Sequence, residues 1–279
     1  MTTLGGTPAL IGLPYDASSS YQRGPADAPA AIREALWSPS ANTWSEIGIN
    51  IGAERAITDA GDLELARCSP ADARRAIENA ITRLLAVGAR PVSLGGDHSV
   101  TYPVLRAVRR SAPSLTILHV DAHPDLYDEF EGDRYSHACP FARIMEEQLA
   151  DRLVQVGIRT MTEHQRAQAR RFGVEVIEMR NIQADLRVPL NTPVYVSIDV
   201  DALDPAFAPG VSHREPGGLS VRQLLSLLHG IEEPIVAADV VELNPRNDPT
   251  GISAMVAGKV VRELIGVMLR GNGVRPRLA

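Results

Sequence analysis

The sequence predicts an α/β protein in which helices cover both faces of a central, mostly parallel sheet, giving a three-layer αβα sandwich. Short apolar runs alternate with segments of helical periodicity along the chain. The runs contain few polar residues, which is typical of parallel strands that are buried on both faces. With 44% hydrophobic residues among 279, the chain can bury a sizeable core. We place no domain boundary and predict a single domain over residues 1–279.

Seven apolar runs account for most of the predicted sheet, and the alternation favours about seven or eight strands in all. The runs span residues 9–13, 91–94, 115–120, 153–157, 174–177, 194–200 and 235–241.

Helical patterns fill most of the segments between these runs. They span residues 25–36, 99–110, 162–172 and 252–269, and two further helices begin at Ser69 and Ser220. Ser69 is a candidate N-cap with a proline directly after it, and Ile77 and Ile81 fall on one face of the helix that follows. The polar segment 125–137 is long for a connection, so it is either disordered or part of a functional site.

Composition argues against several classes of partner. The net charge is −6 and no basic cluster stands out, so nucleic-acid binding has little support. The apolar stretches are too short to cross a bilayer. Cys68 and Cys139 are far apart and form neither a disulfide framework nor a thiolate zinc site. This cysteine content fits a reducing cytoplasm, and no signal peptide is visible at residues 1–8, so we expect a cytoplasmic protein.

Three of the predicted strands end in histidine and aspartate residues. Ligands bind at the carboxyl ends of the strands in open parallel sheets, so these side chains should meet in one crevice. In an extended chain residues i and i+2 point to the same side, which would direct Asp121 and His123, and likewise Asp199 and Asp201, towards a common centre. The full set is His98, Asp121, His123, Asp125, Asp199 and Asp201.

Four neighbouring carboxylates would raise one another's pKa sharply unless cations lay between them. Two divalent ions remove this repulsion, and six ligands for two ions imply that some aspartates are shared. Carboxylate and imidazole donors without thiolate favour Mn²⁺, with Zn²⁺, Co²⁺ and Ni²⁺ as competitors. A pair of such ions activates a water molecule at neutral pH. The sequence therefore predicts a metal-dependent hydrolase.

These motifs resemble those of the ureohydrolase family, which includes arginases and agmatinases. Residues 197–205 read Ser-Ile-Asp-Val-Asp-Ala-Leu-Asp-Pro, which is similar to the most specific signature of the family. Residues 24–33 resemble its first helix, and residues 123–143 and 210–218 look most like plant-type arginases and bacterial agmatinase-like proteins. The resemblance covers nearly the whole chain and implies the arginase-like form of the αβα sandwich.

The resemblance also assigns two manganese ions per subunit. It gives one ion to His98, Asp121, Asp125 and Asp199, and the other to Asp121, His123, Asp199 and Asp201, with Asp121 and Asp199 as bridging ligands. Glu242 matches the glutamate that binds the substrate guanidinium, and His137 matches a mobile-loop histidine that acts as a proton shuttle. Asp125 would pass a proton to the leaving amine.

The resemblance implies that an alkylguanidine, a small cationic substrate, is cleaved to urea and a primary amine. Asp133 stands where plant-type arginases carry an amide, and an ionised carboxylate there would repel a substrate carboxylate. We therefore expect agmatine, which gives putrescine for polyamine biosynthesis. The alternatives are arginine, which gives ornithine, or another guanidino compound. Arg134, His213 and Arg214 lie in loops that line the mouth or lie near it, and their roles stay open.

Two rival hypotheses come from outside this class. The first is a single-zinc amide hydrolase similar to the histone-deacetylase-like enzymes, but the sequence lacks their adjacent pair of histidines. The second is a protein that binds guanidines without turnover, and the complete ligand set speaks against it. Relatives in the ureohydrolase family are commonly trimers or hexamers, so the resemblance also implies a homotrimer or homohexamer.

Overall fold

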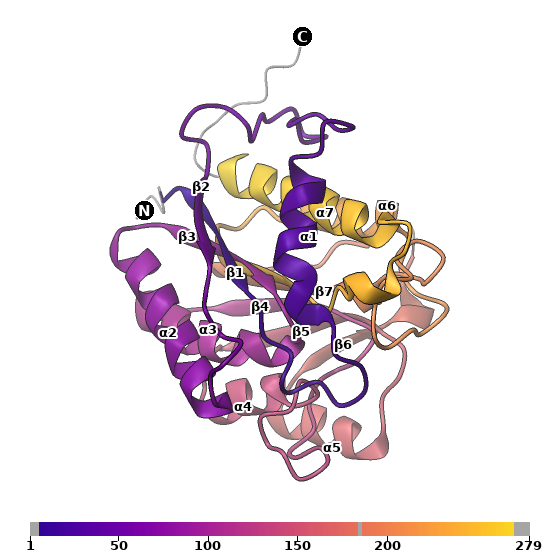
Figure 1. Ribbon diagram of the computed structural model, residues 1–279. Helices are drawn as coiled ribbons and strands as arrows, with labels where there is room; N and C mark the ends of the chain where they lie inside the picture. The colour runs from indigo at the N-terminus through magenta and orange to yellow at the C-terminus, as the bar shows by residue number, and fades with distance from the viewer. Residues whose placement is uncertain (1–5, 184–185, 271–279) are drawn as a thin grey trace.

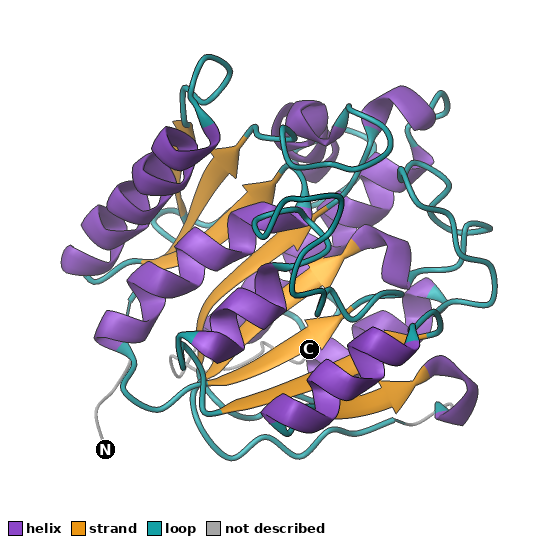
Figure 2. Ribbon diagram, turned by 90° about the horizontal axis from the view of Figure 1, so that it is seen from below, coloured by secondary structure: helices purple, strands orange, loops and turns teal. Residues whose placement is uncertain are grey.

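A computed structural model describes residues 6–183 and 186–270. Its eight strands form one sheet in the order β2-β1-β3-β8-β7-β4-β5-β6, and every pair of neighbours is parallel. Figure 2 shows these strands running between the helices. The strands are β1 (Pro8–Leu13), β2 (Thr58–Asp62), β3 (Arg90–Gly95), β4 (Thr116–Val120), β5 (Arg152–Ile158), β6 (Glu175–Glu178), β7 (Val194–Asp199) and β8 (Ile235–Val241).

The helices form two layers, one on each face of the sheet. The elements are α1 (Ala28–Leu36), α2 (Pro70–Ala86), α3 (Thr101–Ser111), α4 (Pro140–Glu146), α5 (Glu163–Phe172), α6 (Val221–His229) and α7 (Ile252–Arg270). Helices α1, α6 and α7 pack together on one face, and α2 to α5 cover the other (Figure 1). The predicted αβα sandwich with a parallel sheet is therefore confirmed.

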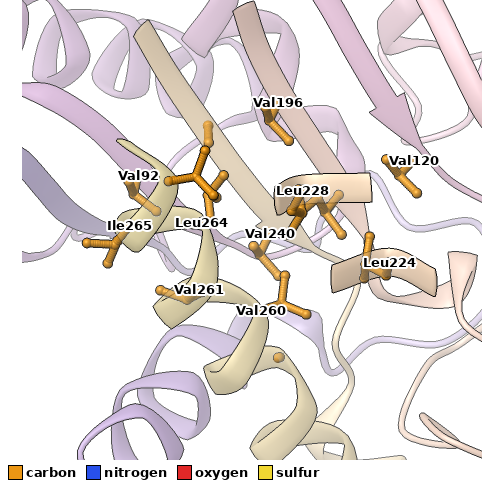
Figure 3. Close-up of a cluster of buried hydrophobic side chains, with 14 of the residues drawn as sticks. Val92, Val120, Val196, Leu224, Leu228, Val240, Val260, Val261, Leu264 and Ile265 are labelled. Carbon is orange, nitrogen blue, oxygen red and sulfur yellow. The ribbon is translucent and has the colours of Figure 1, made fainter. Parts of the chain in front are cut away.

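Aliphatic side chains form the core between the sheet and the helices, as the low aromatic content requires. Figure 3 shows Val92 and Val240 of the sheet beside Val261 and Leu264 of α7 and Leu228 of α6, and these five residues are buried in one cluster. Close packing of branched aliphatic side chains holds α6 and α7 against the sheet, which fixes the loops at its carboxyl edge.

Two elements were missed by the sequence analysis. Strand β2 reads Thr-Asp-Ala-Gly-Asp, is exposed along its whole length and has none of the apolar residues that predict a strand. It pairs with β1 at the edge of the sheet, and its Asp59 and Asp62 bind Arg33 of α1. Helix α4 has only seven residues, too few to give a clear periodic pattern.

The strand register aligns four carboxyl ends at one edge of the sheet. Val240 of β8 lies beside Leu94 of β3 and Ile198 of β7, and Ile198 in turn lies beside Val120 of β4. The residues that directly follow these four strands therefore emerge next to one another. Across the described ranges, none of the helices combines the length and apolar character needed to span a bilayer.

We expect Leu264→Ala to lower the free energy of unfolding by about 2–5 kcal/mol, because it opens a cavity at a fully buried position between α7 and the sheet. Denaturant titration followed by circular dichroism measures this. Val87→Ala is the control, since Val87 is 79% exposed and its truncation should cost little. Equal stability of the two variants would contradict the packing described here.

Candidate active site

The buried ring of His98 faces three carboxylates. Its Nδ1 lies 3.2 Å from Oδ2 of Asp121, 3.1 Å from Oδ2 of Asp125 and 3.2 Å from Oδ2 of Asp199. This nitrogen is nevertheless without a hydrogen-bond partner in the part of the chain that the structure describes. A buried polar atom without a partner is costly, so the four side chains call for a positively charged occupant between them.

The other ring nitrogen of His98 shows which tautomer the protein favours. His98 Nε2 lies 2.9 Å from Oγ of Ser197, which lies 2.7 Å from Oδ1 of Asp239. The Asp239 carboxylate also accepts hydrogen bonds from Thr101 and Tyr195. An ionised carboxylate only accepts, so Ser197 donates to Asp239 and accepts from the N–H at His98 Nε2. The lone pair of a neutral His98 ring is then on Nδ1, where a metal ion would bind.

A second group of ligands shares Asp121 with the first. His123 Nδ1 lies 3.0 Å from Oδ2 of Asp201 and 3.5 Å from Oδ1 of Asp121. The three side chains offer ligand atoms that all lie within 4.8 Å of one another. The structure thus brings the six predicted ligands together in two adjoining groups.

Turns, and not the extended backbone expected from the sequence, direct these pairs. Asp199 Oδ1 accepts a hydrogen bond of 2.7 Å from the backbone N–H of Asp201, at the start of a 3-10 helix over Val200–Ala202. Asp121 Oδ1 accepts one of 2.6 Å from the N–H of His123. Each aspartate side chain thus accepts a hydrogen bond from the backbone two residues on and forms an Asx-turn, which is common for this residue.

The electrostatics of the cluster favour a bound cation. Burial, and then the neighbouring carboxylates of Asp201 and Asp121, raise the pKa of Asp199 well above its ordinary value. Burial alone would lower the pKa of His98, but the surrounding carboxylates outweigh it and raise that pKa well above its usual value. Positive charge at Nδ1 of His98 is therefore strongly favoured. The carboxylate and imidazole groups of the cluster are ligands that fit divalent metal ions.

His119 is a residue of the site that the sequence analysis overlooked. Its Nε2 lies 2.7 Å from Asp121 Oδ2, its Nδ1 lies 3.0 Å from the amide nitrogen of Gln155, and its ring stacks on Phe141. With both nitrogens hydrogen-bonded, His119 holds Asp121 in place, and it also lies close enough to His98 and Asp121 to form a potential ligand group with them. The sequence pattern could have indicated His119, because it lies two residues before Asp121 and therefore on the same side of an extended strand.

Glu242 and His137 lie beside the cluster as a hydrogen-bonded pair. His137 Nδ1 lies 2.8 Å from Glu242 Oε1, which also accepts from the backbone N–H of His98 at 2.8 Å. The backbone N–H of Ser20 donates to His137 Nε2 at 3.2 Å, so a neutral His137 carries its proton on Nδ1. Burial would lower the pKa of His137, but the Glu242 carboxylate outweighs it and raises that pKa to about 9.

Two of the carboxylates have unusual backbone conformations. Asp125 has φ 48° and Glu242 has φ 64°, a left-handed region that aspartate tolerates but glutamate rarely adopts, so the strain lies at Glu242. Such strain persists only where the surrounding structure holds it, and it is common at functional sites. Glu242 is held by its backbone N–H, which donates to the carbonyl of Gly96 at 2.9 Å.

A cavity of ≈ 170 Å³ opens onto this cluster. Part of its wall is the polar segment 125–137, which lies over the site and is fixed by Arg143, whose guanidinium binds the carbonyls of Asp128 and Arg134. The cavity is lined by Ser20, His123, Asp125, Tyr127, Phe130, His137, Ala138, Gln165, Asp199, Asp201, His213 and Glu242.

The residues that the sequence analysis left unassigned fall in different places. His213 lines the cavity, with its ring centroid 5.3 Å from that of His137. Arg214 is exposed and donates to the carbonyl of Pro209. Arg134 forms ion pairs with Asp128 and Glu146.

Asp133 is exposed outside the cavity lining, and its carboxylate accepts from the backbone N–H of Tyr135 at 2.7 Å. Asp133 is therefore not placed to repel a substrate carboxylate in this cavity.

A parallel α/β sheet that gathers carboxylates and imidazoles at one edge, beside a cavity with a glutamate–histidine pair, defines the class of metal-dependent α/β hydrolases. The chain belongs to the arginase family, whose sequence model matches residues 7–266. It is thus a hydrolase that acts on carbon–nitrogen bonds of guanidino compounds, and the predicted family is confirmed.

The similar proteins extend over almost the whole chain. "Arginase 1, mitochondrial" from Oryza sativa subsp. indica is 49% identical over 95% of this chain and 83% of its own length. The structure of an arginase from Medicago truncatula has a TM-score of 0.90 at 46% identity, covering 95% of this chain and 88% of the other. The structure of a proclavaminate amidino hydrolase from Streptomyces clavuligerus has a TM-score of 0.85 at 34% identity, covering 96% of this chain and 93% of the other.

The predicted cytoplasmic location is contradicted by the relatives, because the rice arginase and others like it are mitochondrial proteins by name. That prediction depended in part on the cysteine content of the chain. Two widely spaced cysteines indicate that the fold needs no disulfide, and this does not distinguish one reducing compartment from another.

We expect Ser197→Ala to weaken Mn²⁺ binding by roughly 10- to 100-fold, because His98 loses the acceptor that fixes its tautomer. Isothermal titration calorimetry on metal-depleted protein measures this affinity. Ser93→Ala is the matched control, since Ser93 is a fully buried strand serine whose Oγ has no hydrogen-bond partner among the described residues. Similar affinities in both variants would show that Ser197 does not control the His98 ring.

Proposed function

We propose that the protein hydrolyses arginine to urea and ornithine with two Mn²⁺ ions. The observation that carries this proposal is the 49% identity to plant arginases over 95% of the chain, together with a candidate site in which the six predicted ligands lie close together. Agmatine was our first expectation, but it depended on Asp133, which the cavity lining does not include. Arginine, the alternative, is the better supported substrate.

The ions would be held by the six residues assigned from the sequence. In this proposal His98 and Asp125 would help to hold one ion, His123 and Asp201 would help to hold the other, and two aspartates would serve both sites. Those aspartates are Asp121 and Asp199. When bound, the ions supply a water molecule activated for attack at neutral pH.

Glu242 would hold the guanidinium of the substrate. Its Oε1 is committed to His98 and His137, whereas its Oε2 has no hydrogen bond among the described residues. A planar guanidinium that donates to Oε2 is thereby oriented by a carboxylate that cannot rotate away. The strained backbone of Glu242 serves the same end, because it fixes the direction of the side chain.

His137 and Asp125 would move protons. Both line the cavity, and His137 carries a proton on Nδ1 in its hydrogen bond to Glu242. Loss of the amine from the guanidinium carbon requires protonation of its nitrogen. Asp125 is placed to deliver that proton, and His137 to exchange protons with solvent.

Other parts of the function remain proposals drawn from the family. A homotrimer or homohexamer is still our expectation for the assembly. A guanidino acid is the second candidate substrate, because the proclavaminate amidino hydrolase has the same fold at 34% identity.

The proposal predicts that the Mn²⁺-loaded protein releases urea from arginine with a kcat/KM well above that for agmatine. Steady-state urea assays on arginine, agmatine and guanidinobutyrate, run side by side, measure this. A clear preference for agmatine would restore our first expectation, and no urea from any of the three would refute the proposed class of reaction.

A second prediction concerns Glu242. Glu242→Gln should reduce kcat/KM for arginine by about 100-fold or more, because the guanidinium loses a buried, charged acceptor. Glu263→Gln is the matched control, since Glu263 is equally buried but binds His229 and Lys259 away from the cavity. An activity loss of the same size in both variants would mean that general destabilisation, and not substrate binding, is being measured.

A further inference from the structure

Gln165 is a buried residue of the cavity that the mechanism above does not use. It is the third residue of α5, it is only 4% exposed, and it lines the cavity. Glu242 directly follows β8, and β5, which precedes α5, is separated from β8 by β7 and β4. From this strand order we infer that Glu242 and Gln165 lie towards opposite ends of the cavity. Three interstrand spacings amount to about 14 Å. Gln165 is therefore placed to meet the end of the substrate that is remote from the guanidinium.

The orientation of the Gln165 amide is fixed by a capping box. The backbone N–H of Thr162 donates to Oε1 of Gln165 at 3.0 Å, and the N–H of Gln165 donates to the Thr162 hydroxyl at 3.3 Å. A backbone N–H can only donate, so the atom that it meets must be the amide oxygen. The amide nitrogen, Nε2, has no hydrogen bond among the described residues and is the polar group that Gln165 offers to the cavity.

The surroundings of Gln165 favour a negatively charged group. The carboxylates of the cavity belong to the metal and guanidinium end. Near Gln165, the adjacent His164 stacks on Tyr127, which contacts Phe130, so aromatic rings form this wall. Gln165 also lies in the first turn of α5, where the helix dipole favours anions. The N–H groups of Nε2 attract a carboxylate and offer nothing to an ammonium group.

We propose that Gln165 is a specificity-determining residue whose Nε2 binds the carboxylate of the substrate. This rests on the proposed function, since it takes the guanidinium to lie at Glu242. Gln165 thus favours arginine and other guanidino acids over agmatine, which has no carboxylate.

Substitution with glutamate separates this role from helix capping. Gln165→Glu keeps an oxygen for the Thr162 N–H but replaces the donor by an acceptor that repels a carboxylate. We expect kcat/KM to fall roughly 10- to 100-fold for arginine and guanidinobutyrate, and to change less than about three-fold for agmatine. Urea assays on the Mn²⁺-loaded enzyme measure these ratios, and thermal unfolding should show an unchanged Tm.

A matched control comes from α6. Gln223 occupies the same place in a second capping box, with Ser220, and does not line the cavity. Gln165→Ala and Gln223→Ala should lower Tm by similar amounts, but only Gln165→Ala should lower kcat/KM for arginine relative to agmatine. Equal losses on arginine and agmatine in Gln165→Glu, or no loss on arginine, would overturn the proposal.

The same assays distinguish this proposal from the proposed function. A wild-type enzyme that hydrolyses guanidinobutyrate but not arginine would refute the proposed function, yet the ratio of guanidinobutyrate to agmatine would still test Gln165. A wild-type enzyme that hydrolyses only agmatine would overturn both.

Discussion

The structure depends on one electrostatic constraint, which is that four aspartates and two histidines are gathered where water is largely excluded. Burial raises the pKa of Asp199, and the carboxylates around His98 favour positive charge at its Nδ1. Such a group of side chains is tolerable only around cations, so much of the surrounding architecture serves to hold acceptors in place. The chain from Asp239 through Ser197 to His98 and the contact between His119 and Asp121 are both of this kind.

The parallel sheet is what makes this concentration of charge possible. Four adjacent strands end in register. Asp121, Asp199 and Glu242 directly follow the last apolar residue of β4, β7 and β8, and His98 comes shortly after the end of β3. Packing of α7 and α6 on one face and of α3 on the other fixes those strand ends without any disulfide. Rigid strands and helices thereby support the ligand cluster, whereas loops form the outer wall of the cavity. Changes in these loops can alter the substrate preference without disturbing the cluster.

The two ends of the cavity differ in how well the sequence predicts their side chains. The inner end is fixed by charge, and its residues were identified from motifs. The outer end is lined by aromatic and amide side chains, and its composition depends on which loop side chains point inwards. Asp133 carried the argument for agmatine, yet it binds its own turn, whereas Gln165 and His213 line the cavity. A residue type in a loop does not indicate its direction, because direction is set by hydrogen bonds to the rest of the fold.

The sequence by itself determined the αβα sandwich, because apolar strand runs and periodic helices follow from local chemistry. It also predicted a metal site of six residues, because aspartates that directly follow buried strands need a compensating charge, and the structure brings these six residues together. It did not reveal β2, whose residues are polar and which exists only through pairing with β1. Tertiary structure alone decided the tautomer of His98, because Ser197 and Asp239, which set it, lie far from His98 in the chain. It also decided that Gln165 and His213 line one cavity, because that depends on how loops distant in the chain pack together.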